Sequence, residues 1–176
     1  NRPLTICSYM YNNCFFSEWG QEKFLEYGNM LNETLPIYDQ KKLVPLCQPN
    51  KSKKIKIGFF SADIRSNHSV TYFLKTIVDH CDKNKFEIYL YFNHKKTFED
   101  QTTKYFKDLA NKFVNISALN DEGAINLIRK DKIDIFVDLM GITSESRLSL
   151  IKNKVSPVQI SWCGYTNTTG LDEMDY

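Results

Sequence analysis

Two kinds of segment alternate along residues 55–164. Short and nearly continuous apolar runs predict buried strands at 55–60, 86–92, 113–116, 133–140 and 157–164. Between them, apolar residues recur at helical spacing and predict helices over 70–82, 97–112, 121–131 and 144–154. Strands that alternate with helices in this way indicate βαβ units, which build a mostly parallel sheet covered on both faces. We therefore predict an α/β fold with a Rossmann-like, five-stranded sheet.

The first 50 residues have a different pattern. Residues 17–35 begin with Ser17, which can cap a helix, and then carry large apolar residues at near-helical spacing: Trp19, Phe24, Leu25, Tyr27 and Leu31. Residues 36–54 contain three prolines and show no period, which is typical of a linker along a surface. We predict a helical flank and linker over residues 1–50, followed by the Rossmann-like domain over 51–176.

Composition narrows the class of partner. The chain has 176 residues, of which 42% are hydrophobic and 25% charged, as in an average globular protein with one sizeable core. The net charge of +2 provides no field that would attract nucleic acid or anionic lipid. No stretch approaches the roughly 20 consecutive apolar residues of a membrane helix, and no signal peptide opens the chain. We expect no nucleic acid and no membrane as partner.

Because the chain starts at Asn1 and ends after a motif-like run, we expect a fragment of a longer protein.

The five cysteines have no CxxC pair and no zinc-like spacing. Their odd number argues against a complete disulfide framework. We therefore predict no metal site, and a reducing, cytoplasmic setting.

In a Rossmann-like sheet, ligands bind beyond the carboxyl ends of the strands. Three loops with polar residues or glycine should gather there: "SADIRSNHS" (61–69), "GITSES" (141–146) and "GYTNTTG" (164–170). None contains a GxGxxG or Walker arrangement, which argues against NAD, FAD or ATP as the ligand of this region. A GxSxG elbow is also missing, which argues against an α/β-hydrolase.

Asp63 and His68 in the first loop are the candidate reacting groups. A carboxylate five positions before an imidazole could fix the orientation of the ring or itself take a proton from a hydroxyl. The structural alternative is that Asp63 forms an Asx-turn, that Asn67 or Ser69 caps the next helix, and that His68 is merely partly exposed.

The loop after the last predicted strand also has two interpretations. Its backbone amides and threonines could donate hydrogen bonds to an oxyanion or a sugar hydroxyl. Equally, Asn167 and Gly170 could be turn residues, with Trp162 in the core.

The amino-acid sequences of two of these segments are similar to the motifs of one known family. "IKIGFFSADIRSNHS" (55–69) is matched by the patterns "LRVGYVSSDFGNHP" and "LRIGFVSGDLRNHP". "DIFVDLMGITSESRLSLIKNKVSPVQISWCGYTNTTGLDEMDY" (134–176) is matched by "DILVDLxGxTxxxRLxxxxxRPAPVQxxWLGYPGTTGxxxMDY". On these motifs the chain resembles the catalytic region of the O-GlcNAc transferase and SPINDLY-like protein glycosyltransferases.

The resemblance implies half of a GT-B glycosyltransferase, in which two Rossmann-like halves enclose the active site, usually after tetratricopeptide repeats. Such enzymes move GlcNAc, or fucose in some members, from a nucleotide-diphosphate donor to Ser or Thr hydroxyls of proteins. They invert the anomeric centre and use no metal. The chain resembles the acceptor-side half. The half that binds most of the donor, UDP-GlcNAc or another nucleotide sugar, would follow Tyr176, so the fragment alone should not turn over. No further cofactor is implied.

The resemblance also implies roles for individual residues. Asp63 takes the place of the aspartate that relays the acceptor proton, and His68 that of the histidine beside the hydroxyl and the donor phosphate. The matching substrate-binding positions are Asn67, Gly141, Thr143, Gly164, Tyr165, Thr168, Thr169 and Gly170. The departures from the family pattern, which bear on acceptor choice and on activity, are Cys7 for a histidine, Ser69 for proline, Ile142 for His or Tyr, Cys163 for Leu, and Thr166 and Asn167 for Pro-Gly.

Two other classes of function are alternatives to this interpretation. A non-catalytic module derived from the same family could hold a peptide or partner at the same edge. A flavodoxin- or receiver-like regulator is disfavoured, because the first loop has no acidic cluster and no phosphate cradle.

Overall fold

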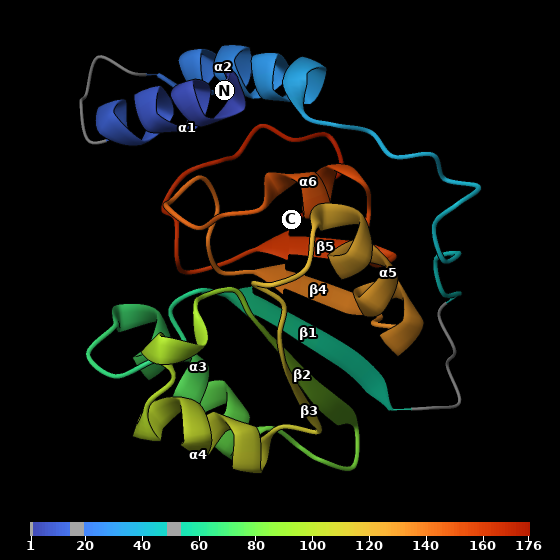
Figure 1. Ribbon diagram of the computed structural model, residues 1–176. Helices are drawn as coiled ribbons and strands as arrows, with labels where there is room; N and C mark the ends of the chain where they lie inside the picture. Colours follow the sequence, from blue (N-terminus) through green and yellow to red (C-terminus); the bar gives the residue numbers. More distant parts are fainter. Residues whose placement is uncertain (1, 15–19, 49–53) are drawn as a thin grey trace.

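The computed structural model describes residues 2–14, 20–48 and 54–176 (Figure 1). The helices are α1 (Arg2–Asn13), α2 (Gln21–Thr34), α3 (Ser69–His80), α4 (Gln101–Leu109), α5 (Asp121–Asp131) and α6 (Leu148–Lys152), with a 3₁₀ turn, η1 (Lys96–Phe98). The strands are β1 (Ile55–Ser61), β2 (Phe86–Phe92), β3 (Lys112–Asn115), β4 (Ile135–Asp138) and β5 (Val158–Ser161). The described part of the chain thus has five strands, all parallel, in the order β3-β2-β1-β4-β5. The predicted α/β fold is confirmed.

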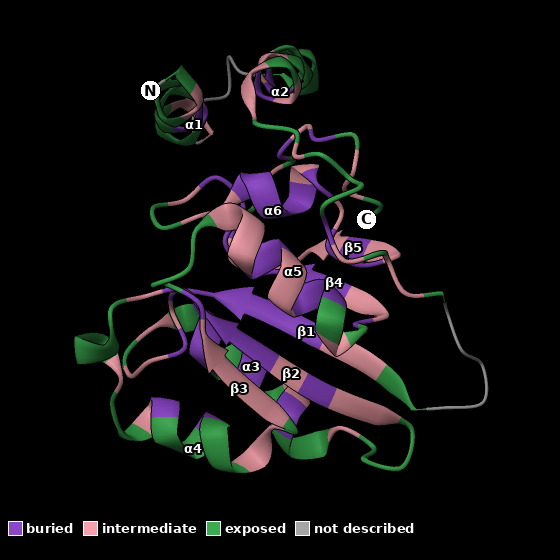
Figure 2. Ribbon diagram, turned by 45° about the vertical axis from the view of Figure 1, so that its right-hand side comes forward, coloured by how far each residue is buried: buried purple, intermediate pink, exposed green. Residues whose placement is uncertain are grey.

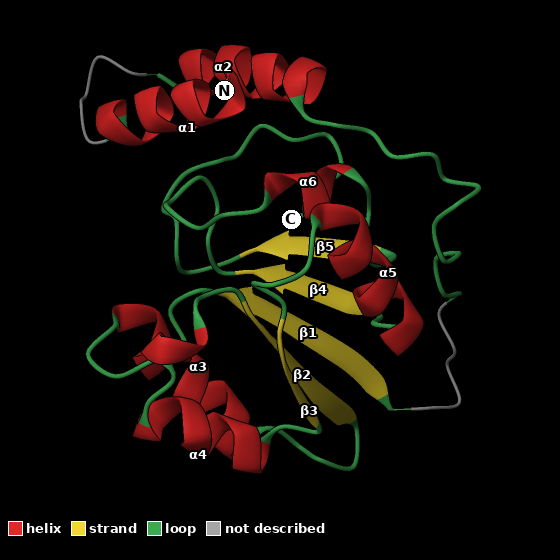
Figure 3. Cartoon of the chain, viewed as in Figure 1, coloured by secondary structure: helices red, strands yellow, loops and turns green. Residues whose placement is uncertain are grey.

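Helices cover both faces of the sheet, as Figures 1 and 3 show. Successive strand residues point to opposite faces, and β1 shows the result. Phe59 packs in the cluster under α3 and α4, while Phe60 packs in the cluster under α5 and α6. Both side chains are buried, at 3% and 1% exposure. This burial on two sides explains why the strands are nearly continuous apolar runs.

The N-terminal helices form a further layer outside α6 (Figure 1). Met10 of α1 and the α2 residues Phe24 and Leu31 are buried and belong to the same apolar cluster as the α5 and α6 side of the sheet. Their outer sides are exposed (Figure 2). α2 begins after Gly20, whereas the predicted cap Ser17 and the predicted apolar position Trp19 lie outside the described residues.

Side chains of α5 and the turn after α6 fasten the linker. Asn153 accepts a hydrogen bond from Tyr38 N (2.8 Å) and donates one to Pro36 O (2.8 Å). Arg129, only 3% exposed, donates from Nη1 to Val44 O (2.9 Å) and from Nε to Lys154 O (3.1 Å). Residues 36–44 of the linker therefore follow a fixed path along the molecule, although their sequence shows no period.

Two helices start later than the pattern predicts. α4 begins at Gln101 instead of 97, because Asp100 caps it by accepting from Thr103 N, while η1 occupies part of the preceding residues. α6 begins at Leu148 instead of 144, after a turn in which Glu145 has φ 64°. No helix in the described residues is both long and apolar enough to cross a bilayer.

Candidate functional site

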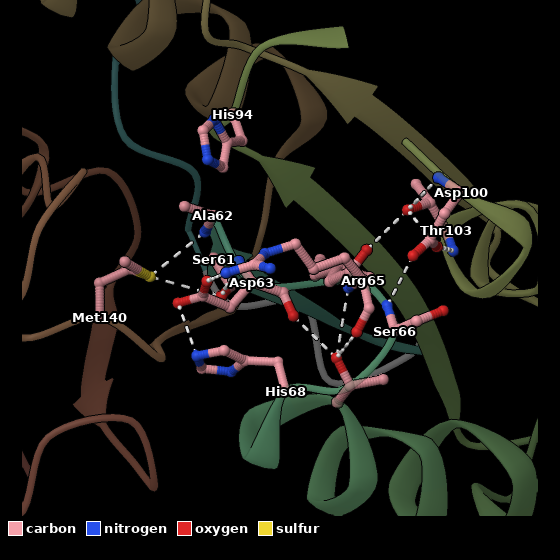
Figure 4. A network of polar contacts seen from close by, with 12 residues as sticks. Ser61, Ala62, Asp63, Arg65, Ser66, His68, His94, Asp100, Thr103 and Met140 are labelled. Atoms are coloured by element: carbon pink, nitrogen blue, oxygen red, sulfur yellow. Dashed lines mark hydrogen bonds and ion pairs between the residues drawn. The ribbon is translucent and has the colours of Figure 1, made fainter. Parts of the chain in front are cut away.

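The loops that follow β1, β4 and β5 meet at the carboxyl edge of the sheet. Met140 Sδ lies 3.4 Å from Ser61 Oγ and 3.2 Å from Ala62 N, which joins the loop after β4 to the loop after β1 (Figure 4). Gly141 packs so closely on Tyr165 that a Cβ at Gly141 would overlap that side chain. The three loops named from the sequence therefore form one continuous rim.

Asp63 and His68 face each other across the first loop (Figure 4). His68 Nε2 lies 3.5 Å from Asp63 Oδ2, and the two side chains are 31% and 18% exposed. His68 Nδ1 is buried and has no hydrogen-bond partner among the described residues. The arrangement gives a partly exposed imidazole with a carboxylate on one nitrogen and a buried, unpaired second nitrogen. A carboxylate and an imidazole in contact are side chains that serve as general bases in enzymes.

The capping alternative for this loop is wrong. The N-cap residue of α3 is His68 itself, rather than Asn67 or Ser69, and its side chain makes no capping hydrogen bond. The described contacts of the Asp63 carboxylate go to the side chains of His68 and Arg65 instead of to a local backbone N–H, as an Asx-turn would require.

Arg65 is a neighbour of the pair that the sequence interpretation missed. Its Nη2 lies 3.3 Å from Asp63 Oδ1, so the carboxylate lies between a guanidinium and an imidazole. Arg65 Nε is buried without a partner among the described residues. The available signal was a cation two positions after the aspartate in the same loop.

The first loop is one residue longer than in the family patterns quoted above. Four residues separate Asp63 from His68 here, against three in those patterns. The segment between them includes Asn67, which is exposed and adopts φ 58°, a left-handed conformation that asparagine tolerates better than most residues. Thr71 of α3 holds this turn from one side, since its Oγ1 lies 2.7 Å from Asp63 O and 2.8 Å from Arg65 O.

The loop after β4 reaches towards α1. Gly141 has φ 57°, and Thr143 Oγ1 donates to Met140 O (2.7 Å). A hollow of about 330 Å³ separates Thr143 from α1, and Cys7 lines its other side. Burial raises the pKa of the Cys7 thiol to about 11, so the thiol stays protonated at neutral pH and does not act as a proton acceptor. Ile142 is buried at 4% exposure and contributes no polar group.

The loop after β5 divides into an open and a packed part. Thr168 is exposed, and its Oγ1 accepts from Gly170 N (3.0 Å). Thr169 is 2% exposed. Gly170 has φ 67° and lies against the backbone of Gly28 in α2, and its carbonyl accepts from Asn32 Nδ2 (2.9 Å). Packing therefore accounts for the last two positions of this loop, and their predicted contact with substrate stays a prediction.

Tyr165 and Gly164 complete the rim. Tyr165 is 7% exposed, and its hydroxyl is buried with no partner among the described residues. Burial raises the pKa of this phenol. Gly164 touches the backbone of Leu139 so closely that any side chain at 164 would collide with that carbonyl oxygen. Trp162 packs against the cluster under α3 and α4, in line with its interpretation as a core residue. Binding by Gly164 and Tyr165 also stays a prediction.

Asp138 is a buried carboxyl group beneath this rim. It is 2% exposed, and its two oxygens accept from Met140 N (2.9 Å) and Gly141 N (3.0 Å). Burial raises the pKa of Asp138 from 3.8 to about 7, although the two N–H groups favour the charged form. The residue thus shapes the turn that carries Met140 and Gly141.

The pKa of Asp138 predicts a pH-dependent stability difference. A folded-state pKa above the unfolded value contributes stability that is fully present below about pH 4 and lost as the pH rises to about 7. The free energy of unfolding of the wild type, minus that of Asp138→Asn, should therefore fall between pH 4.5 and 7 and level off above. Urea unfolding of both proteins at several pH values measures it. A constant difference would show that Asp138 titrates normally.

Comparisons with known proteins place this geometry in a family. The sequence pattern of glycosyl transferase family 41 matches residues 29–176. The probable UDP-N-acetylglucosamine–peptide N-acetylglucosaminyltransferase SPINDLY of Arabidopsis thaliana is 35% identical over 128 residues, which are 70% of this chain and 14% of that protein. The SPINDLY protein of Hordeum vulgare is 31% identical over 163 residues, 90% of this chain and 16% of that protein. The chain therefore spans about a seventh of the length of these curated relatives.

A solved structure shares the fold. The O-GlcNAc transferase of Thermobaculum terrenum, as its K341M mutant, superposes with a TM-score of 0.84 at 24% identity. The superposition covers 100% of this chain and 33% of that chain. From the match over residues 29–176 and the two SPINDLY relatives, the chain belongs to glycosyltransferase family 41.

Proposed function

We propose that this chain is the acceptor-side half of an inverting, metal-independent glycosyltransferase that moves a sugar, N-acetylglucosamine in the first place, from a nucleotide diphosphate to Ser or Thr hydroxyls of proteins. The observation that carries the proposal is the Asp63–His68 pair, which lies partly exposed at the carboxyl edge of the sheet. The names of the SPINDLY relatives, which act on peptides, support the donor and the acceptor class.

The proposed reaction needs one proton acceptor and one nucleophile. The oxygen of the acceptor hydroxyl forms a bond to the anomeric carbon, and the bond from that carbon to the diphosphate oxygen breaks. The hydroxyl proton passes to the Asp63–His68 pair, and the nucleotide diphosphate leaves with the electron pair. Because His68 Nδ1 is buried, the proton would reach the pair through the Asp63 carboxylate, which lies 3.5 Å from His68 Nε2. Asn67 and Thr168 are exposed on the same rim and are available to contact the acceptor.

The proposal includes the wider setting of the chain. A donor-binding half, tetratricopeptide repeats and a cytoplasmic location are inferred from the family resemblance, and the five free cysteines are consistent with a reducing compartment. No cofactor other than the nucleotide sugar is proposed.

Mass spectrometry of modified acceptors tests the function. A full-length protein that contains these residues is incubated with candidate partner proteins and either UDP-GlcNAc or GDP-fucose. We expect Ser or Thr residues to gain the mass of one N-acetylhexosamine with the first donor, and no gain with Asp63→Asn. A gain only with GDP-fucose would replace the proposed sugar. If partners bind tightly and neither donor modifies them, the chain is a binding module instead.

A further inference from the structure

We infer that Asp100 and Thr103, at the N-terminus of α4, are positioning residues that hold the loop between Asp63 and His68 in its working shape. This inference rests on the proposed function, because it assigns these two residues to the proposed proton acceptor. Neither residue lies in the sheet edge itself, and the sequence interpretation did not single them out.

Asp100 joins a helix start to the loop. Its Oδ1 accepts from Thr103 N (2.9 Å), which caps α4, while its Oδ2 accepts from Ser66 N (2.7 Å), in the middle of the loop (Figure 4). Burial would raise the pKa of Asp100, yet the N–H groups of Thr103 and Ser66 and the hydroxyls beside them lower it to about 2. The carboxylate therefore stays charged at any physiological pH and keeps both acceptors.

Thr103 adds a second anchor. Its Oγ1 donates to Ile64 O (2.8 Å), and both residues are fully buried. Ser66 Oγ makes a further hydrogen bond to Thr102 Oγ1 (2.7 Å). Three successive residues of the turn, 64 to 66, are thus held by hydrogen bonds from α3 or α4.

Asp100 and Thr103 contact the segment that lies between the two proposed reacting groups. Asp63 and His68 lie at the two ends of the segment, so the path of residues 64–67 sets the distance between carboxylate and imidazole. That segment is one residue longer than in the quoted family patterns and passes through the left-handed Asn67. A displacement of about 1 Å in a reacting group can cost about a hundredfold in rate. Holding Ser66 to α4 therefore keeps the pair in contact.

Asp100→Asn separates the two roles of Asp100. Asparagine caps a helix as well as aspartate, so α4 should remain stable. Its amide nitrogen, however, would oppose the N–H of Ser66, where Asp100 now offers Oδ2. In the full-length enzyme we expect kcat to fall about tenfold or more, with each KM changed less than about twofold, and the midpoint of the acid limb of the pH–rate profile to move. Amide exchange at Ser66 should accelerate, while exchange at Thr103 should stay slow.

Thr103 provides a paired test. Thr103→Val removes the hydroxyl that donates to Ile64 O and should lower kcat, whereas Thr103→Ser keeps that donor and should restore most of it. Asn120→Ala serves as the control, because Asn120 caps α5 through Gly123 N (2.8 Å) and, within the described part of the chain, makes no hydrogen bond to the loop. This control should lose some stability and keep its kcat.

The outcomes are decisive in each case. Faster exchange at Ser66 with kcat unchanged would overturn the positioning role, and so would unchanged exchange at Ser66. If the wild type transfers no sugar, the proposed function fails, and the positioning role is judged by the NMR titration of His68 alone. A titration midpoint that moves between wild type and Asp100→Asn supports it, and identical midpoints overturn it.

Discussion

His68→Ala and Asp63→Asn are each expected to slow sugar transfer at least tenfold in a full-length enzyme, without unfolding it. Positioned acid–base groups typically contribute about 10² to 10⁴ in rate, and each substitution removes one member of the pair that would receive the acceptor proton. Both variants should still fold. The His68 side chain makes no capping hydrogen bond to α3, and an asparagine at position 63 has the same size as aspartate. Initial rates at saturating donor and acceptor, with thermal unfolding curves, measure both effects.

The same helix offers a matched control for the histidine. His80 is the last residue of α3, is exposed, and lies at the opposite end of the helix from His68. His80→Ala should keep the wild-type rate. Wild-type rates in both Asp63→Asn and His68→Ala would refute the catalytic assignment and favour a module that binds without transfer.

Gly164→Ala is expected to destabilise the fold by about 3 kcal/mol or more. A Cβ at this position would collide with the carbonyl oxygen of Leu139, which is backbone and has no rotamer that could relieve the overlap. Leu139 N in turn donates to Phe60 O (3.0 Å), so a shift of Leu139 would disturb β1 as well. Chemical denaturation gives the change in the free energy of unfolding.

Gly20→Ala is the natural comparison. A Cβ at Gly20 would meet nothing within 4 Å, so this substitution adds no clash, and the loss of a favoured N-cap residue costs only about 1 kcal/mol. If both variants lose the same small amount of unfolding free energy, the loop after β5 can move away from Leu139, and the packing of the rim is less rigid than its contacts imply.

The alternating pattern predicts the sheet well because burial on both faces leaves a strong signal in each strand. β2 matches its predicted bounds, and α5 does too, since Asn120 and the acidic first turn mark its start. Local pattern fails where a distant contact decides the structure. Phe73 is a large apolar residue of α3 and yet is 55% exposed, because Val70, Leu74 and Val78 already form the stripe that packs on the sheet.

Only the part of the site that lies within a single loop could be predicted from the sequence. Asp63 and His68 belong to the same strand-to-helix joint, so their proximity follows from the order of the elements. The anchors Asp100 and Thr103 are more than 30 positions away, and a polar residue before a helix looks the same whether or not it also holds a distant loop. The packing of Gly170 on α2 likewise could not be predicted, because Gly170 and its hydrogen-bond partner Asn32 are 138 positions apart in the sequence.

The backbone contact between Gly28 and Gly170 ties α2 directly to the rim of the site. Neither residue has a side chain that could bend aside, so a tilt of the helix moves the loop with it. The N-terminal pair of helices therefore contacts the ligand edge of the sheet through α2. This contact joins α2 to residues 164–170 without involving the sheet.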